Sequence, residues 1–270
     1  MNLKKIIAIG AVAASTIVAV APANAVITTF AQFSAVGSAS NVRWVNNGVA
    51  SNSAVNNTSN GTGGFLYSTS TATSTAPGNV AVTFAFLQPV LASLGPVAAN
   101  FFMNITVASG NAATASGTFR IQNIPTGSFS FTSTQSVTVN NVVYGVGTNL
   151  LTGTFTSGTI FGSGSSGSFS GNSGDGTLVY SSDILDFTNT VDRDYSMGFT
   201  SISPTIFRST SGGNKALRTF RTLATGSFSS DPAPLVTAVP EAASWMLMIA
   251  GFGMVGVSAR RRSRRASVAA

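Results

Sequence analysis

The sequence contains no cysteine and no histidine, and only 8% of its 270 residues are charged. Without cysteine the chain can form no disulfide framework, no thiolate metal site and no cysteine nucleophile. Without histidine it lacks the commonest zinc ligand and the base of a Ser-His-Asp triad. Apolar residues make up 44% of the sequence, the opposite of a disordered chain. We therefore expect a folded body that is not an enzyme and carries no cofactor.

The net charge of +7 is concentrated at the two ends of the chain. Lys4 and Lys5 lie near the start, and five of the 14 basic residues fall within residues 260–265. Between residues 26 and 240, seven basic residues are nearly balanced by six acidic ones. A nucleic-acid interface needs a clustered basic stripe, and only the loose run 208–221 approaches one. We therefore expect no nucleic-acid partner.

Residues 1–25 have the three-part layout of a secretory signal peptide. The two lysines are followed by an apolar stretch over residues 6–20, and Ala23 and Ala25 form an A-x-A cleavage site. The alternative is an N-terminal membrane anchor that is not cut, but the apolar stretch is short for spanning a bilayer. We predict a signal helix, cleavage after Ala25 and export of the remaining chain.

Residues 242–259 form a second apolar segment, 18 residues without a charge. At about 1.5 Å per residue a helix of this length spans roughly 27 Å, close to the hydrocarbon thickness of a membrane. Trp245 lies near its outer end, where an amphipathic ring prefers the headgroup region. A buried core helix is the alternative. The arginine-rich run that follows favours a single transmembrane helix with a cytoplasmic stop over residues 260–265 and a short tail over 266–270; its arginines are Arg260, Arg261, Arg262, Arg264 and Arg265.

The same C-terminal segment, residues 240–265, resembles the PEP-CTERM sorting signal, most closely its PEPxxWA variant. Two positions depart from that pattern: Ala242 stands where a second proline is usual, and Met246 where alanine is usual. The matching residues are Pro240, Glu241, Trp245, Met248, Ile249, Gly251, Phe252 and Gly253.

The resemblance implies a substrate of an exosortase-type membrane transpeptidase in a Gram-negative bacterium. Such a protein would be held transiently in the inner membrane, cut near the Pro-Glu segment and passed to the cell surface or the extracellular space. Proteins of this kind are associated with exopolysaccharide and biofilm. The resemblance covers only the C-terminal segment and implies nothing about the fold of the body.

Alternating apolar and polar residues predict strands in the body, residues 26–230. Phe101, Met103, Ile105 and Val107 would share the buried face of one strand.

Elsewhere Phe119 and Ile121 would be buried while Arg120 and Gln122 face outward. Residues 137–144 predict a hairpin, because its central asparagine pair tolerates the positive φ of a tight turn.

A unit of glycine, a small hydroxyl residue and phenylalanine recurs along the body. We expect a turn or bulge at each glycine, an outward hydroxyl and an inward ring. The spacing is irregular, so the units are not a solenoid repeat. They are Gly117-Thr118-Phe119, Gly127-Ser128-Phe129, Gly153-Thr154-Phe155, Gly167-Ser168-Phe169 and Gly226-Ser227-Phe228.

Three segments are predicted as connections: residues 89–100, which proline interrupts, the glycine- and serine-rich stretch 157–176, and a proline-rich linker over 231–239. Many short strands with frequent turn residues predict an all-β fold, an antiparallel β-sandwich or jelly-roll-like body, with the signal helix before it and the transmembrane helix after it.

Candidate chemistry in the body is confined to a few acidic and aromatic residues. A Ca²⁺ site is one hypothesis for the acidic cluster, although no EF-hand spacing is present and solvated loop carboxylates are the alternative. Glycoside hydrolysis requires two carboxylates that flank the scissile bond, and the candidate pair in the body is Asp183 with either Asp192 or Asp194. The acidic cluster consists of Asp175, Asp183, Asp186, Asp192 and Asp194.

Aromatic side chains could stack on sugar rings, but core packing is the commoner role and is the one we expect; the candidates are Trp44, Tyr67, Tyr144, Tyr180 and Tyr195. Two functions stay open: a structural or interaction component of the surface matrix, or a carbohydrate-binding or carbohydrate-acting module.

Overall fold

The computed structural model describes residues 27–48, 61–71, 73–74, 76–207 and 215–237. The predicted signal peptide, membrane helix, sorting residues and arginine-rich stop lie outside these ranges. Within the described ranges, no helix is both long enough and apolar enough to cross a membrane.

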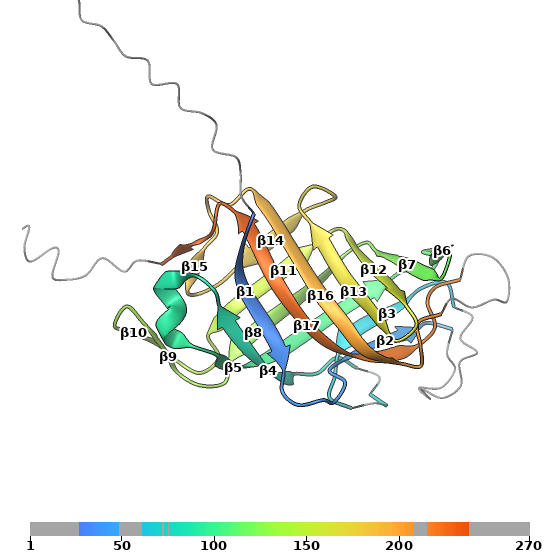
Figure 1. Ribbon diagram of the computed structural model, residues 1–270, viewed down its shortest axis with the longest axis horizontal. Helices are drawn as coiled ribbons and strands as arrows, with labels where there is room; N and C mark the ends of the chain where they lie inside the picture. Colours follow the sequence, from blue (N-terminus) through green and yellow to red (C-terminus); the bar gives the residue numbers. More distant parts are fainter. Residues whose placement is uncertain (1–26, 49–60, 72, 75, 208–214, 238–270) are drawn as a thin grey trace, which may run out of the picture.

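The described residues form strands almost throughout, as the alternation predicts (Figure 1). One 3₁₀ helix, η1 (Pro89–Leu94), interrupts them. The strands are β1 (Thr28–Ala35), β2 (Val42–Asn46), β3 (Gly64–Ser68), β4 (Val80–Phe86), β5 (Val97–Val107), β6 (Thr114–Ser116), β7 (Phe119–Ile124), β8 (Gly127–Ser133), β9 (Val137–Val139), β10 (Val142–Tyr144), β11 (Asn149–Phe155), β12 (Gly158–Ser163), β13 (Ser166–Asn172), β14 (Leu178–Ser181), β15 (Leu185–Asp186), β16 (Asp192–Ser203), β17 (Phe220–Asp231) and β18 (Leu235–Val236).

Fourteen strands join in one antiparallel sheet, whose main path runs β14-β11-β8-β5-β3-β2-β17-β16-β13-β12-β7-β6. Each of the long strands β5 and β17 pairs with two shorter strands in succession along the same edge. β5 pairs with β4 and then with β3, and β17 pairs with β2 and then with β1. Because β1 also pairs with β4, two links connect β5 to β17 side by side. The sheet folds over at these links.

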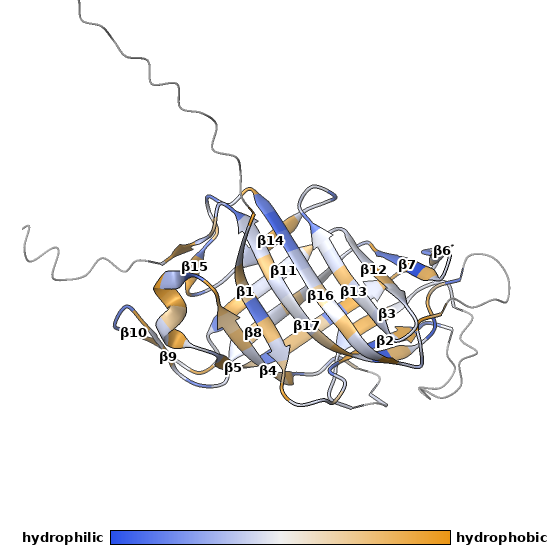
Figure 2. Cartoon of the chain, in the orientation of Figure 1, coloured by the Kyte–Doolittle hydropathy of each residue, from blue (hydrophilic) through white to orange (hydrophobic). Residues whose placement is uncertain are grey.

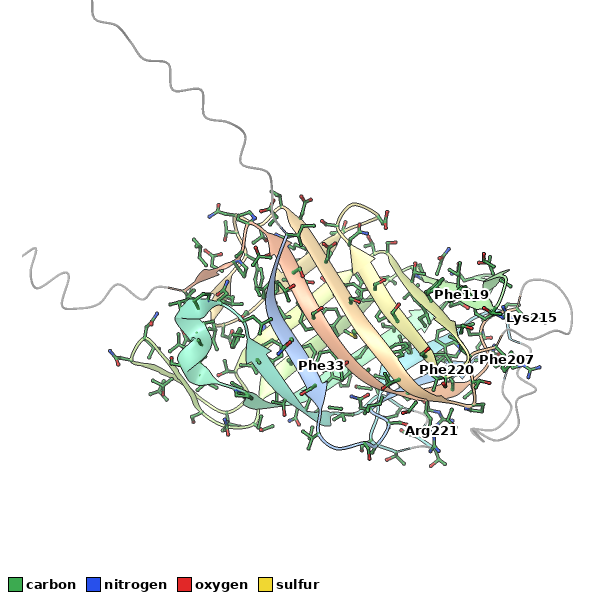
Figure 3. The ribbon with its side chains drawn as sticks, viewed as in Figure 1. Phe33, Phe119, Phe207, Lys215, Phe220 and Arg221 are labelled. Atoms are coloured by element: carbon green, nitrogen blue, oxygen red, sulfur yellow. The ribbon has the colours of Figure 1, made fainter. Side chains whose placement is uncertain are left out.

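The folded sheet forms two layers that enclose an aromatic core (Figures 1 and 3). Phe33 of β1 contacts Phe131 of β8, with ring centroids 4.9 Å apart. Phe129 of β8 lies 5.3 Å from Phe228 of β17. These contacts join strands that are not hydrogen-bonded neighbours, so the rings meet across the layers. The all-β fold with two antiparallel layers is confirmed, and a single continuous sheet supplies both of them.

The turn predicted for the Gly-x-Phe units is confirmed at Gly117, which has φ 59°, whereas Gly127, Gly153 and Gly226 lie in strands and are covered by aromatic rings. In the pairing of β8 with β11, Gly127 lies opposite Phe155 and Phe129 lies opposite Gly153. A Cβ atom built on Gly153 would lie 2.3 Å from the Phe129 ring. At these three glycines a flat ring therefore fills the space that a side chain would occupy, which favours the observed register of the paired strands.

The prediction for β5 is confirmed, and the prediction for β7 is wrong by one residue. Phe101, Met103, Ile105 and Val107 are all buried. In β7 the buried positions include the polar Gln122, whereas Phe119 is 43% exposed.

Gln122 can be buried in β7 because its side chain has hydrogen-bond partners. The Gln122 side chain accepts a hydrogen bond from the backbone N–H of Leu217 at 3.2 Å and donates to the backbone oxygens of Asn111 and Asn123. A buried amide that is fully paired in this way costs little, so the strand can bury the polar residue and expose the aromatic one.

The predicted hairpin over residues 137–144 is confirmed as β9 and β10, with Asn140 at φ 50° and Asn141 at φ 65°. The prediction of a loop over residues 157–176 is wrong, because β12 and β13 form a hairpin there. Two other predicted connections are partly strand. β5 begins at Val97, and β18 of the predicted linker pairs with β15.

Candidate functional site

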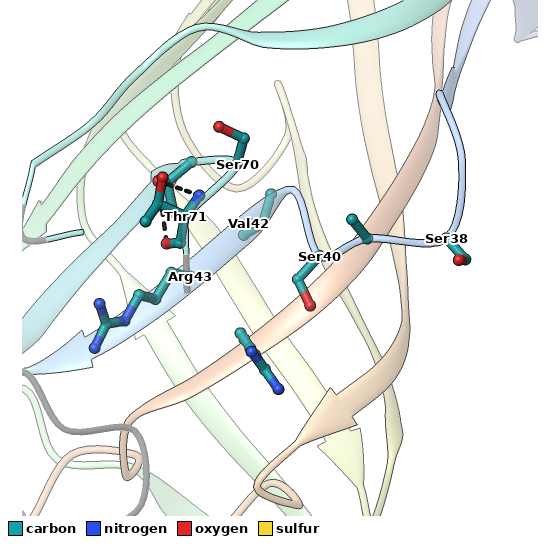
Figure 4. Close-up of a pocket in the computed structure, with 9 residues that line it drawn as sticks. Ser38, Ser40, Val42, Arg43, Ser70 and Thr71 are labelled. Carbon is teal, nitrogen blue, oxygen red and sulfur yellow. Dashed lines mark hydrogen bonds between the residues drawn. The ribbon is translucent and has the colours of Figure 1, made fainter. Parts of the chain in front are cut away.

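A pocket of about 280 Å³ opens beside β2 and contains two arginines. Arg43 belongs to β2 and Arg221 to β17, and the two residues lie directly opposite each other in the pairing of these strands. The loop before β2 supplies Ser38 and Ser40. The segment after β3 supplies hydroxyls from the other side, as Figure 4 shows. The pocket is thus a cationic site with a hydroxyl rim.

Arg43 is fixed by its surroundings, because its side chain is only 1% exposed. Its Nη1 donates a hydrogen bond to the backbone oxygen of Ser74, and the hydroxyl of Tyr67 donates to the same oxygen at 2.6 Å. Burial raises the pKa of Tyr67, and the neighbouring Arg43 offsets part of that shift. The phenol is therefore a neutral donor that helps to hold the guanidinium in place.

The start of β17, which carries Arg221, is anchored to β2 by buried polar groups. The indole Nε1 of Trp44 donates to the backbone oxygen of Leu217 at 2.9 Å, and the side-chain amide of Asn46 donates to the same oxygen at 2.9 Å. Asn46 also accepts the backbone N–H of Gly61 at 2.8 Å. These bonds set the register that places the two arginines side by side.

A second hollow, a trough of about 580 Å³, lies on the outer face of β4, β1, β17 and β16. Its described lining contains no charged residue. Its hydroxyl and amide groups come from Gln32, Ser34, Thr83, Ser196, Thr225 and Ser227.

The polar side chains of the trough belong to a row that crosses the whole layer. Gln32 of β1 pairs with Ser227 of β17, which pairs with Ser196 of β16. Ser196 pairs with Ser170 of β13, and Ser170 with Thr159 of β12. Figure 2 shows the pale, weakly polar positions of these strands between the hydrophobic ones. The trough can exchange hydrogen bonds with a neutral ligand, and no charged side chain lines it.

The acidic residues lie at the opposite end of β17 from the arginine pocket. Asp192 pairs with Asp231 at the far end of the β16–β17 ladder. Burial, with a smaller contribution from Asp192, raises the pKa of Asp194. The proposed calcium ligands are not gathered, since no group of three or more acidic side chains in the described ranges could hold a metal ion.

Two of those candidate ligands are engaged locally instead. The carboxylate of Asp183 accepts the backbone N–H of Asn149 at 2.7 Å. Asp186 accepts both the backbone N–H and the hydroxyl of Thr188, and these bonds lower its pKa.

The carboxylates that share a pocket are a different pair from the one considered for glycoside hydrolysis. Asp175 and Asp194 line a hollow of about 270 Å³ together with Tyr195. The Tyr195 hydroxyl is buried and has no hydrogen-bond partner among the described residues. Asp183 does not line this hollow.

Arg193 stabilises a turn in this acidic region. Its guanidinium donates to the backbone oxygens of Leu178, Phe187 and Thr190 and to the hydroxyl of Thr190. It therefore acts as a clamp on the segment between β14 and β16.

Most of the aromatic residues considered for sugar stacking are core residues, as expected: Trp44, Tyr67, Tyr180 and Tyr195 are buried, and Tyr144 is partly buried against the core. Among the residues that the structure describes, the exposed large aromatic rings are phenylalanines. Phe119 stacks on Phe161 at a centroid distance of 4.7 Å, and both are about two-fifths exposed.

Comparison with protein families identifies the C-terminal segment. Residues 238–262 match the family described as PEP-CTERM protein-sorting motif. No curated protein and no solved structure matches the chain.

The chain thus carries the sorting signal that the sequence predicts. Such a signal marks an exported protein that is transiently anchored in the membrane and processed by exosortase, itself a membrane protein. The residues that carry the motif lie outside the described ranges.

Proposed function

We propose that this protein is a non-catalytic structural or interaction component of the cell-surface matrix, linked to exopolysaccharide or biofilm. Sorting through exosortase delivers it, after which the two-layer body performs its role at the surface or outside the cell. The observation that carries the proposal is the uncharged trough on a body that bears an export and sorting motif. Serine, threonine and glutamine side chains can each donate and accept, which suits the hydroxyls of a neutral sugar.

Delivery can be tested with an epitope tag inserted between Asn140 and Asn141. Both residues are exposed at the tip of the β9–β10 hairpin, which pairs only with itself, so the insertion leaves the main sheet intact. With exosortase present, the tag should reach the cell surface or the medium. Without exosortase it should stay with the inner membrane, and an identical distribution in both strains would overturn the proposed route.

The matrix role is tested on the same tagged protein. Material outside the cell should sediment with exopolysaccharide and stay soluble after the polysaccharide is digested. Replacing Ser227 and Ser196 together by aspartate places two charges at the centre of the trough and should weaken this association. Ser128→Asp/Ser130→Asp, on the outward positions of β8, is the matched control. Equal association of both double variants with the polysaccharide would count against the trough.

We further propose that the sorting signal is of the PEPxxWA type, with Pro240 and Glu241 presented to the transpeptidase. Mature protein should lack Trp245 and the terminal arginines, which intact-mass measurement detects. Ala242→Pro, which restores the usual second proline, should increase the released fraction, whereas Pro240→Ala should decrease it. Released protein that retains Trp245 would refute this assignment.

A carbohydrate-acting enzyme is the second candidate, because Asp175 and Asp194 line one hollow. Incubating extracted exopolysaccharide with the protein would then produce reducing ends, and Asp194→Asn would abolish them. Asp183→Asn, outside the hollow, is the control. We expect no reducing ends from any of the three proteins.

A further inference from the structure

The arginine pocket concentrates positive charge that no carboxylate of its own lining balances. Arg43 and Arg221 are paired residues on neighbouring strands, and a sheet normally avoids like charges at paired positions. The lining of the pocket contains hydroxyl residues and the two arginines but no acidic residue. Like charges at paired positions are unfavourable in isolation, and an anion bound in the pocket would offset them.

Asp231 and Asp192 are too far away to act as that anion. Arg221 and Asp231 lie on the same strand, ten positions apart. At about 3.3 Å per residue this is roughly 33 Å, several times the screening length of about 8 Å at physiological salt. Asp192 is paired with Asp231 at that same far end.

The two arginines have complementary roles in the pocket. Arg43 is buried and held by its bonds, so its guanidinium is a rigid wall that needs no reorganisation when a ligand arrives. Arg221 is half-buried, and no hydrogen bond or ion pair involves its guanidinium in the part of the chain that the structure describes. Figure 3 shows Arg221 at the surface near the start of β17. A ligand can therefore engage its donors directly.

We propose that this pocket binds the carboxylate of an acidic sugar, a hexuronate unit of a surface polysaccharide. Arginine presents parallel N–H donors that match a carboxylate in bidentate geometry. The rim hydroxyls of Ser38, Ser40 and Thr71 can pair with the hydroxyls of the same ring. A volume of about 280 Å³ admits one sugar ring at a time. This assignment rests on the proposed matrix function and names one of its ligands.

The test is affinity electrophoresis in gels that contain polyglucuronate, with neutral polyglucose gels as the reference. All proteins are full-length in detergent, with the five arginines of residues 260–265 replaced by glutamine so that they do not bind the polyanion. Arg221→Gln should weaken retardation by about tenfold or more, because it removes a charge-assisted hydrogen-bonding pair. Arg120→Gln, which loses the same charge on β7, should behave like the parent protein. Arg221→Lys should recover only part of the binding, since lysine keeps the charge but not the fork.

Competition identifies the anionic group. Free glucuronate should release the protein from polyglucuronate, and inorganic phosphate at equal concentration should do so less well. Equal losses in the Arg221→Gln and Arg120→Gln proteins, stronger competition by phosphate, or no retardation of the parent protein would each overturn the assignment. If the parent is not retarded while the tagged protein still sediments with exopolysaccharide, the pocket assignment fails and the matrix function stands.

Discussion

Replacing Gly153 by alanine would place a methyl group where the ring of Phe129 lies. The new Cβ would be 2.3, 2.6 and 2.8 Å from three ring carbons, whereas carbon atoms in contact are normally about 3.5–4.0 Å apart. The ring would have to move by about 1 Å or more. It has little room, because its centroid lies 5.4 Å from that of Tyr195 and 5.3 Å from that of Phe228.

Overpacking of this kind costs about 1–3 kcal/mol. Alanine also restricts the unfolded chain and returns about 0.4–1 kcal/mol. We expect Gly153→Ala to lower the free energy of unfolding by about 1–2 kcal/mol, or Tm by roughly 2–8 °C for a domain of this size. Urea and thermal unfolding, followed by near-UV circular dichroism, measure the change.

Gly198 is the matched control, since it also lies in a strand but the nearest atoms to a Cβ there are those of Thr225, at 3.9 and 4.0 Å. Gly198→Ala should be neutral or stabilising. The cost of Gly153→Ala should also fall in a Phe129→Leu background, because the displaced ring is gone. A Gly153→Ala protein as stable as Gly198→Ala, or an unchanged cost in that background, would refute the role of the ring.

Three further changes test other parts of the structure. Gln122→Leu should lower the free energy of unfolding by about 1–3 kcal/mol in urea denaturation, because the buried N–H of Leu217 loses its acceptor; an unchanged midpoint would contradict this. Arg193→Met should destabilise by a similar amount of about 1–3 kcal/mol, and Arg193→Lys should not restore stability, because a single ammonium cannot reproduce the clamp. Asp194→Asn should be more stable than wild type at neutral pH. Since burial and Asp192 raise the pKa of Asp194 in the folded state, wild-type stability should rise as pH falls through that pKa, and the difference should shrink in a pH series of unfolding curves; a constant difference would exclude this cause.

The sequence predicts the parts of the fold that depend on local pattern. Strand β5 follows from strict alternation, and the β9–β10 hairpin follows from an asparagine pair at positive φ. The β12–β13 hairpin does not follow, because glycine and serine alone bury little. Its stability comes from distant aromatic partners such as Phe199, which lies opposite Gly167. The composition of this segment is typical of a loop, so it does not predict strands whose buried contacts are made with residues of other elements.

The arginine pocket depends on information that the sequence pattern does not hold. Arg43 and Arg221 are far apart in the chain, and only the register of β2 against β17 makes them neighbours. The burial of Gln122 likewise requires a backbone donor 95 residues away. A polar residue at an inward position interrupts the apolar–polar alternation, so it is assigned to the exposed face unless its buried hydrogen-bond partner is known. Local periodicity thus predicts strands, and long-range pairing decides which polar side chains they bury or bring together.

The position of the pocket agrees with the way the body is tethered. The described chain ends beside β15, where the backbone N–H of Thr237 donates to the backbone oxygen of Ile184 at 3.0 Å. The sorting motif follows directly, so the body is held at the end that carries the aspartates. Arg221 lies at the other end of β17, roughly 33 Å from Asp231 at the strand spacing. The proposed polysaccharide ligand would therefore have access to the pocket while the chain is still anchored.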